Sequence, residues 1–180
     1  MKILILDGSP HPNGTTSLLR KAFAEGALSA GHTVDTFHTA KEDLHPCLGC
    51  NHCRNTGDGC VYKDGMEKLN PLLLMADCVV FSTPLYYFGM SAQIKMAIDR
   101  FFANNQVLRA QKKQAVLLAA CGDTDSWALD ALDAHYHAVC HYLHWGKRRG
   151  SERHRHVHAR RHRGLGLPGG SARPRPEPER

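Results

Sequence analysis

The chain has 180 residues, of which 42% are hydrophobic, and this length favours a single domain with a sizeable core. No run approaches the roughly 20 apolar residues of a membrane-spanning helix, and the apolar run at residues 1–6 is too short for a signal peptide. We therefore expect a cytoplasmic protein without membrane association. The seven cysteines, an odd number with four of them clustered, favour reduced thiols over a disulfide framework.

The net charge of +6 is distributed unevenly along the chain. Residues 1–146 carry 12 basic and 14 acidic side chains, whereas residues 147–180 carry 11 basic and 3 acidic ones. The body is therefore mildly acidic, and binding to nucleic acid would depend on the tail alone. We expect no nucleic-acid partner.

The first part of the chain reads as strand, helix and strand. Lys2–Asp7 is an apolar run that stops at Gly8, which is typical of a buried parallel strand followed by a turn. Apolar residues at helical spacing predict a helix over residues 16–30, with Gly31 as its C-terminal cap. Residues 33–38 alternate apolar and polar side chains and predict a second, weaker strand.

A cysteine-rich loop follows at residues 44–60. Its cysteines are separated by two, two and six residues, and its glycines permit the tight turns that bring thiolates together. The spacing makes this loop a candidate metal site and the chain a candidate redox protein. The four thiols belong to Cys47, Cys50, Cys53 and Cys60.

The remaining elements continue the alternation. We expect a helix over residues 64–75, a buried strand over 76–83, a helix over 91–104, a strand over 114–120 and a helix over 126–145. Strands alternating with helices at this rhythm predict an α/β fold with a doubly wound parallel sheet. Ligands in such sheets bind outside the carboxyl ends of the strands. The loops that begin at Gly8, Thr83 and Cys121 are therefore expected to form one site.

The loop between the first strand and the first helix, Gly8–Ser17, is rich in hydroxyls and glycine. Its amides lie at a helix N-terminus, where anions bind. It lacks the Gly-Lys-Ser or Gly-Lys-Thr ending of an NTPase loop, and its glycine spacing does not match the dinucleotide fingerprint. A small phosphomonoester is the ligand that fits. The alternative is a plain turn capped by Thr15 or Thr16.

The segment Ser82–Ser91 places three aromatic residues and a glycine at the end of the next buried strand. A flat ring could pack there, beside the phosphate loop. An aromatic loop is also compatible with a role in the core or in an interface.

These two loops, the run through Gln93, Lys95, Asp99 and Arg100, and the cysteine loop together resemble the flavodoxin-like NAD(P)H-dependent FMN reductases, in particular their iron-sulfur flavoprotein branch. The resemblance covers residues 1 to about 145. It implies strand order 2-1-3-4 and FMN chemistry in which the flavin, with no protein acid or base, carries out catalysis. The implied FMN-binding residues are Ser9, His11, Asn13, Thr15, Thr16, Ser17, Pro84, Leu85, Tyr86, Tyr87, Phe88, Gly89, Cys121, Gly122 and Asp123.

The resemblance also implies partners. Such proteins pass electrons from NADH or NADPH, or from a ferredoxin-like donor, through FMN to a small-molecule acceptor, and they work as homodimers or homotetramers. We therefore expect an NAD(P)H-dependent oxidoreductase. Two alternatives stay open: a non-enzymatic electron carrier with the same cofactors, and a binding protein that uses a four-cysteine zinc site.

Three interpretations of Cys47, Cys50, Cys53 and Cys60 compete. The resemblance favours a [4Fe-4S] cluster that relays electrons to or from the flavin, although the last spacing differs from the bacterial ferredoxin run and no Cys-Pro is present. Structural zinc also accepts four cysteines, but its ligands usually form two separated pairs. The third interpretation is free thiols, with a reversible disulfide between neighbouring cysteines.

The tail at residues 147–180 departs from the family pattern. A flavodoxin-like domain should continue with a fifth strand and a closing helix, but these residues are mostly Arg, His, Gly and Pro. We expect both elements to be missing and the tail to be disordered. A shift of reading frame near Gly146 would explain the abrupt change in composition.

Overall fold

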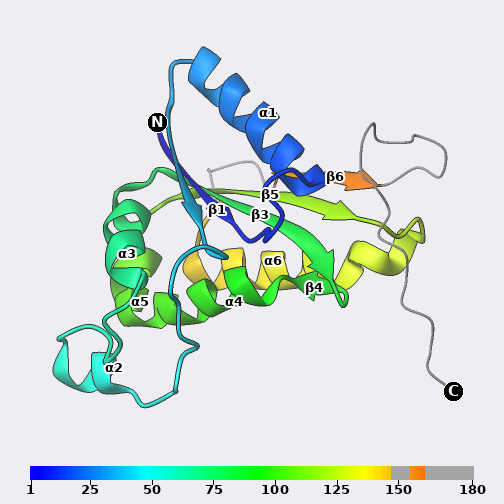
Figure 1. The fold of residues 1–180 in the computed structure, drawn as a ribbon. Helices are drawn as coiled ribbons and strands as arrows, with labels where there is room; N and C mark the ends of the chain where they lie inside the picture. The colour runs from blue at the N-terminus through cyan, green and yellow to red at the C-terminus, as the bar shows by residue number, and fades with distance from the viewer. Residues whose placement is uncertain (147–154, 161–180) are drawn as a thin grey trace, which may run out of the picture.

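The computed structural model describes residues 1–146 and the backbone of residues 155–160. Its centre is a parallel sheet in the order β2-β1-β3-β5-β6, with a short antiparallel strand β4 paired to β3 (Figure 1). The order that we expected for the first four strands is therefore confirmed. The strands are β1 (Lys2–Asp7), β2 (Thr33–His38), β3 (Cys78–Tyr86), β4 (Gly89–Met90), β5 (Gln114–Cys121) and β6 (Arg155–Arg160).

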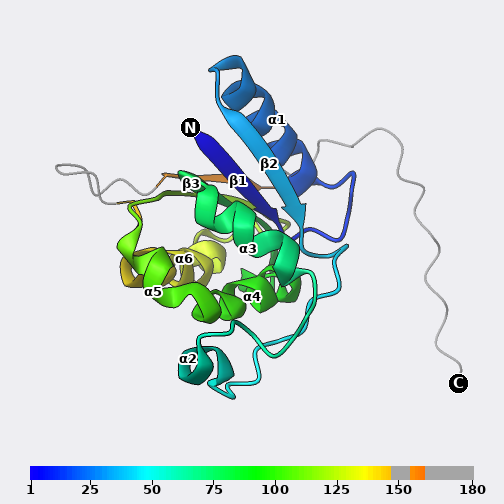
Figure 2. The same ribbon diagram turned by 90° about the vertical axis from the view of Figure 1, so that its left-hand side faces the viewer.

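Helices cover both faces of this sheet. Figures 1 and 2 show α1 on one face and α3, α4, α5 and α6 on the other, with α2 below α4. Their bounds are α1 (Thr15–Ser29), α2 (His52–Thr56), α3 (Met66–Met75), α4 (Ala92–Asp99), α5 (Asn105–Ala110) and α6 (Asp130–Leu143). Two 3₁₀ segments, η1 (Arg100–Asn104) and η2 (Ser126–Leu129), precede α5 and α6.

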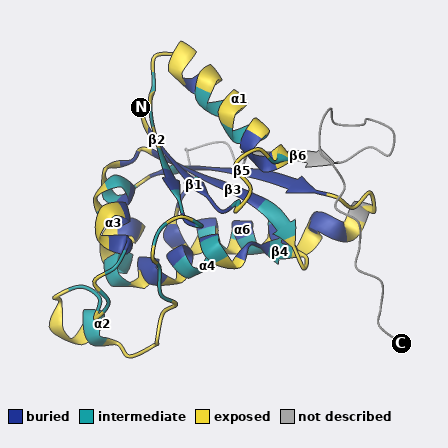
Figure 3. Cartoon of the chain, in the orientation of Figure 1, coloured by how far each residue is buried: buried dark blue, intermediate teal, exposed yellow. Residues whose placement is uncertain are grey.

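The apolar run of β1 forms a strand because both of its faces are buried (Figure 3). Successive side chains of a strand point to opposite faces. Leu4 and Leu6 accordingly join the larger core under α3, α4 and α6, and Ile3 and Ile5 join the smaller core under α1. The continuous apolar sequence is thus the signature of a central parallel strand.

The expected absence of a fifth strand is wrong. The backbone of β6 pairs in parallel with β5, in a register that runs from Val116 opposite Arg155 to Cys121 opposite Arg160. Pairing uses main-chain N–H and C=O groups, so an edge strand does not need an apolar sequence, and composition alone misjudged it. The closing helix would fall in residues 161–180, which lie outside the described residues, as do residues 147–154. The proposed shift of reading frame near Gly146 stays a prediction.

In the part of the chain that the structure describes, no helix has both the length and the apolar character needed to cross a bilayer.

A buried serine joins the connections that follow β1 and β3. The hydroxyl of Ser91 donates to the carbonyl of Gly8 at 2.7 Å, and the amide of Ser91 donates to the hydroxyl of Thr83 at 3.0 Å. The close approach requires glycine at position 8, since an added Cβ would lie 2.6 Å from Ser91 Oγ and 2.8 Å from Ile94 Cβ. The first loop is therefore held against the β3–β4 turn.

We predict that Gly8→Ala lowers the free energy of unfolding by about 1–3 kcal/mol, because the added methyl overpacks the contact with Ser91 and Ile94. Urea denaturation measures the change. Gly26→Ala is the control: Gly26 lies in α1 with open space around it, and its replacement should raise stability by about 1 kcal/mol. Equal stability of Gly8→Ala and the parent chain would contradict the prediction.

Candidate functional site

The β1–α1 loop closes around the carbonyl of His11. This oxygen accepts hydrogen bonds from the hydroxyl of Ser17 at 2.9 Å and from the amide of Gly14 at 3.3 Å. The hydroxyl of Ser9 lies 3.3 Å from the same oxygen and also accepts from the His11 amide at 3.2 Å. The loop is thus organised by its own polar groups.

Helix α1 begins at this loop without a side-chain cap. Its N-cap is Gly14, and no side chain bonds to the amides of the first turn. Thr16 and Ser17 are buried, whereas Thr15 is exposed along with His11 and Asn13 of the loop. The amides that open a helix carry partial positive charge and attract anions. The loop therefore has the donor groups that a phosphate requires, and the phosphate of FMN fits this set.

A buried carboxylate stands behind the loop. Asp7, at the end of β1, is 2% exposed and lies 3.1 Å from Nε of Arg20 and 2.9 Å from Nδ1 of His38. It also accepts from the amide of Ser9 at 3.2 Å. The Arg20 guanidinium offsets the negative charge of this carboxylate, which would otherwise oppose an anion in the loop. Sequence reasoning did not identify Asp7, Arg20 or His38.

The β3–β4 turn presents the aromatic residues. Strand β3 is longer than expected and forms a hairpin with β4, with Leu85 opposite Met90 and Tyr86 opposite Gly89. Tyr87 and Phe88, at the tip, both have positive φ values, of 48° and 64°. Non-glycine residues in this region cost on the order of 1–3 kcal/mol each and cluster at functional sites. Tyr87 is 99% exposed.

The loop after β5 is the third loop at the carboxyl edge of the sheet. Cys121 is buried, and its thiol donates to the carbonyl of Asp123 at 3.2 Å, while Gly122 and Asp123 are exposed. Further along, the ring of Trp127 stacks on Phe88, with centroids 4.9 Å apart. Sequence reasoning missed Trp127, although a single tryptophan in a polar run just after a strand end was a usable signal.

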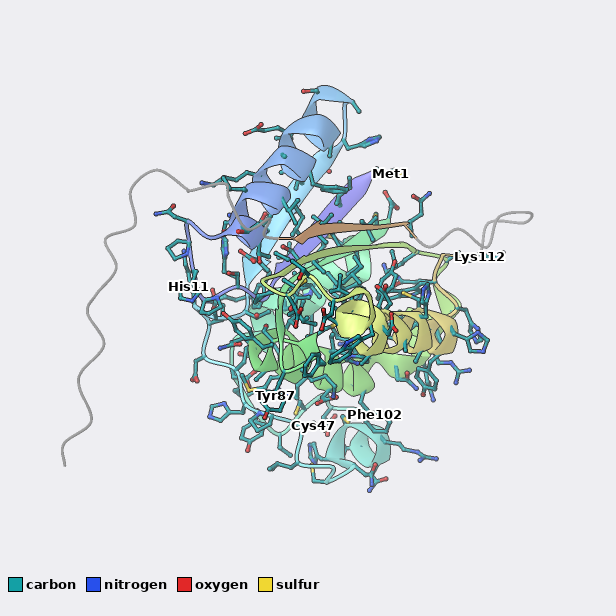
Figure 4. The ribbon with its side chains drawn as sticks, turned by 90° about the vertical axis from the view of Figure 1, so that its right-hand side faces the viewer. Met1, His11, Cys47, Tyr87, Phe102 and Lys112 are labelled. Atoms are coloured by element: carbon teal, nitrogen blue, oxygen red, sulfur yellow. The ribbon has the colours of Figure 1, made fainter. Side chains whose placement is uncertain are left out.

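The three strand-end loops meet at one edge of the molecule, which faces the viewer in Figure 4. Ser91 joins the first two loops, and the Phe88–Trp127 stack joins the second to the third. His11 and Tyr87 both appear at this edge in Figure 4, and in this view Tyr87 lies between His11 and Cys47. The predicted residues of the phosphate loop and the aromatic turn are therefore brought together.

The cysteine loop is a separate excursion that contains α2. Cys47 and Cys50 are exposed, Cys53 and Cys60 are half-buried, and all four thiols are free. Asn51 and three glycines adopt positive φ, which lets the backbone turn tightly around α2; the glycines are Gly49, Gly57 and Gly59. Within the described residues, no three His, Cys, Asp or Glu side chains are placed to hold a metal ion. The loop thus supplies four soft donors that do not converge.

Both ends of this loop are anchored by one buried ion pair. The guanidinium of Arg100, 3% exposed, donates to both carboxylate oxygens of Asp64, at 2.8 and 3.2 Å, and to the carbonyl of His45 at 2.8 Å. Arg100 also lies over the ring of Tyr62, 5.2 Å from its centroid. The loop is therefore fixed to η1 at its entry and at its exit.

The pKa shifts of Asp64 and Arg100 agree with a strong ion pair between them. Burial alone would raise the pKa of Asp64, but hydrogen bonds from Arg100 and from two backbone amides outweigh it and lower the pKa to about 2. Burial alone would lower the pKa of Arg100. The interaction with Asp64, and after it the interaction with Cys60, raises this pKa above its usual value. Arg100 is thus a structural residue, and one cysteine of the loop lies within its influence.

Sequence comparison decides the family. Residues 1–147 match the family described as NADPH-dependent FMN reductase. The chain belongs to this family. The resemblance drawn from the loops is therefore confirmed, as is the flavodoxin-like fold.

Individual relatives agree with the family. An iron-sulfur flavoprotein of Methanocaldococcus jannaschii is 34% identical over 100 residues, which cover 56% of this chain and 51% of the relative. The Bacillus subtilis protein YwqN, whose name describes an NAD(P)H-dependent FMN-containing oxidoreductase, is 29% identical over 68% of each chain. The chain spans about half the length of the first curated relatives that it matches.

A solved structure shares the fold. Smu.1420 from Streptococcus mutans superposes with a TM-score of 0.67 over 89% of this chain and 87% of the other, at 23% identity.

We predict that Arg100→Met costs about 3–5 kcal/mol of stability, because it leaves the buried Asp64 carboxylate without its partner. Lys95→Met is the matched control, since the Lys95–Asp99 pair is exposed and contributes less than about 1 kcal/mol. Thermal unfolding compares the two variants, and reaction with a thiol reagent should be faster for Cys60 in Arg100→Met. Similar small losses in both variants would show that the buried pair does not anchor the loop.

Proposed function

We propose that the chain binds FMN at the carboxyl edge of the sheet and catalyses NAD(P)H-dependent reduction of a small-molecule acceptor. The main support for this proposal is the N-terminus of α1, which has no side-chain cap and is lined by hydroxyls. Ser91 holds this loop against the exposed aromatic turn. Such an edge can bind a ligand in which a short polar chain joins a phosphate to a flat ring. Family membership supports the same cofactor.

The phosphate half of the site is assigned to the first loop. We propose that the α1 amides and nearby polar groups hold the phosphate. These residues are Ser9, His11, Asn13, Thr15, Thr16 and Ser17.

The ring half of the site is assigned to the other two loops. We propose that the isoalloxazine lies against the β3–β4 turn and the loop after β5. The residues are Pro84, Leu85, Tyr86, Tyr87, Phe88, Gly89, Cys121, Gly122 and Asp123. When bound there, FMN would supply the two-electron chemistry: it would accept a hydride, equal to two electrons and a proton, from NAD(P)H and would pass both electrons to the acceptor.

Steady-state oxidation of NADH and NADPH tests the activity. We expect the FMN-loaded protein to turn over with an added quinone or free flavin. If neither cofactor is oxidised but reduced ferredoxin reduces the bound flavin, the protein is an electron carrier, and the enzymatic proposal is wrong.

We predict that Thr15→Asp weakens FMN binding at least about tenfold, because it places a negative charge beside the phosphate. An acidic residue at the first helical position is compatible with the helix dipole, so the fold should be retained. Quenching of flavin fluorescence on binding gives both affinities. Riboflavin, which lacks the phosphate, is the control and should bind to Thr15→Asp and the parent chain within twofold. Equal weakening of both ligands would contradict the phosphate assignment.

We also propose that the cysteine loop binds a [4Fe-4S] cluster after its thiols rearrange. Support comes from four free thiols in one loop that is anchored at both ends, and from the iron-sulfur flavoprotein names of several relatives. The flexible glycine turns allow the required movement. In this proposal the cluster would relay electrons to or from the flavin.

Anaerobic purification with iron, sulfide and zinc analysis tests this proposal. We predict about four iron and four sulfide per chain, lost in Cys53→Ser and retained in Cys140→Ala, whose thiol is buried in the core under α6. One zinc per chain without sulfide would favour structural zinc. If the purified protein contains neither iron nor zinc, the result would favour four free thiols.

Two further expectations stay predictions: assembly as a homodimer or homotetramer, which the family resemblance implies, and a cytoplasmic location, which was expected from the sequence pattern and the cysteine usage.

A further inference from the structure

A buried ion pair lies directly behind the phosphate loop. Oδ2 of Asp7, a residue that is 2% exposed, is 3.1 Å from Nε of Arg20, whose side chain is 14% exposed. The other carboxylate oxygen accepts a hydrogen bond from the amide of Ser9 at 3.2 Å, so the pair contacts the loop itself. Asp7 ends β1, and Arg20 lies in α1. The pair therefore connects the strand before the loop with the helix after it.

The loop has almost no charge of its own. The ten residues from Gly8 to Ser17 contain no Lys, Arg, Asp or Glu. Among the residues that the structure describes, Asp7 is the one acidic side chain that forms a hydrogen bond to this loop. Like charges separated by several ångströms repel strongly where water is excluded. An unpaired carboxylate at this place would therefore oppose a bound phosphate.

The carboxylate is held in place by the sheet. The main-chain carbonyl of Asp7 accepts from the amide and the hydroxyl of Thr39 at 3.0 and 3.1 Å. Asp7 lies opposite His38 of β2 and Ser82 of β3 in the strand register, and Nδ1 of His38 is 2.9 Å from Oδ2. Its charge is therefore a permanent part of the phosphate site, and a cation must offset it there.

Arg20 is the fixed cation beside this carboxylate. It follows Thr16, a buried residue of the first turn of α1, by four positions, so both lie on the helix face that packs on the sheet. Nε of Arg20 is buried without a hydrogen-bond partner, so its contact with Asp7 acts through charge. An arginine keeps its charge at every working pH, whereas a histidine such as His38 does not.

We infer that the Asp7–Arg20 pair sets the preference of this site for phosphorylated over unphosphorylated flavin: Asp7 weakens phosphate binding, and Arg20 cancels that effect. The inference rests on the proposed function, since it concerns the phosphate half of the same FMN site. Neither residue is assigned a contact with the phosphate. A purely structural pair has a different signature, because loss of either partner would then disturb the loop and weaken binding.

The first experiment measures Kd for FMN and for riboflavin at low ionic strength and pH 8 by quenching of flavin fluorescence. Arg20→Met should weaken FMN binding at least about fivefold, because it leaves Asp7 unpaired near a phosphate of about two negative charges. Asp7→Asn should instead strengthen FMN binding at least about threefold, because the charge of Arg20 is then uncompensated. Riboflavin lacks the phosphate, so its Kd should change less than about twofold in both variants.

Two variants control for the change in net charge. Lys21→Met removes a positive charge from the exposed neighbour of Arg20 in α1, and Asp35→Asn removes a negative charge from an exposed position of β2. Both should leave Kd for FMN within about twofold, since water and salt screen exposed charges. Arg20→Lys keeps the charge and should retain FMN binding within about threefold, because Nε of Arg20 forms no hydrogen bond that lysine would lose.

A double variant keeps the test valid if Arg20→Met is unstable. Loss of Arg20 alone leaves a buried carboxylate without its partner, which lowers stability. Asp7→Asn/Arg20→Met removes both charges, and its Kd for FMN should return to within about threefold of the parent value. Weaker or unchanged FMN binding in Asp7→Asn would overturn the inference. Equal weakening of FMN and riboflavin in Arg20→Met would do the same and would assign the pair a structural role.

The second experiment needs neither flavin nor turnover. Inorganic phosphate is titrated into the ¹⁵N-labelled full chain at constant ionic strength, and the amide shifts of Thr15 and Thr16 report binding. Affinity should fall at least about fivefold in Arg20→Met and rise in Asp7→Asn. If the amides respond in this way but the parent chain binds no FMN, the proposed function fails and the inference stands. If phosphate leaves both amides of the parent chain unchanged, the inference is overturned whatever the flavin affinity.

Discussion

The candidate site depends on the hydrogen bonds of one buried serine. Ser91 connects the carbonyl of Gly8, at the start of the phosphate loop, with Thr83 near the end of β3. Parallel strands place their loops at the same edge, but they do not fix the distance between them. Ser91 does so, and glycine at position 8 makes the approach sterically allowed. An uncapped helix N-terminus and a strained aromatic turn thereby become parts of one surface.

The cysteine loop depends on a different interaction. Arg100 and Asp64 form a buried pair below the sheet and hold the loop at both ends, without contact to the phosphate loop in any hydrogen bond described here. The two anchors lie at opposite ends of α4, whose N-cap is Ser91 and whose C-cap is Arg100. The proposed flavin site includes none of the four clustered cysteines, and loss of the Arg100 anchor should affect the cysteine loop first. The family is named for FMN, which agrees with a flavin site that does not include the cysteine loop.

Much of this organisation was predictable from the sequence, because apolar runs and helical spacing report burial directly. The main strands and helices follow from such patterns, whereas the strand order was implied by the family resemblance. Contacts between distant segments could not be predicted: the stack of Trp127 on Phe88 and the charge compensation of Asp7 depend on which loops meet. Strand β6 was missed for another reason. Backbone pairing at a sheet edge does not require apolar residues, so the composition of residues 155–160 was misleading.

The central claim is that FMN places its phosphate at the N-terminus of α1 and its ring beside the β3–β4 turn. Amide chemical shifts of the ¹⁵N-labelled full chain, recorded during FMN titration, test it most directly. The account predicts that the largest changes at one equivalent of FMN occur at Thr15, Thr16, Ser17 and Tyr87. Changes confined instead to the apolar groove between α4 and α6, a cavity of about 350 Å³ lined by Ile98, Phe102, Val139 and Tyr142 among others, would contradict it.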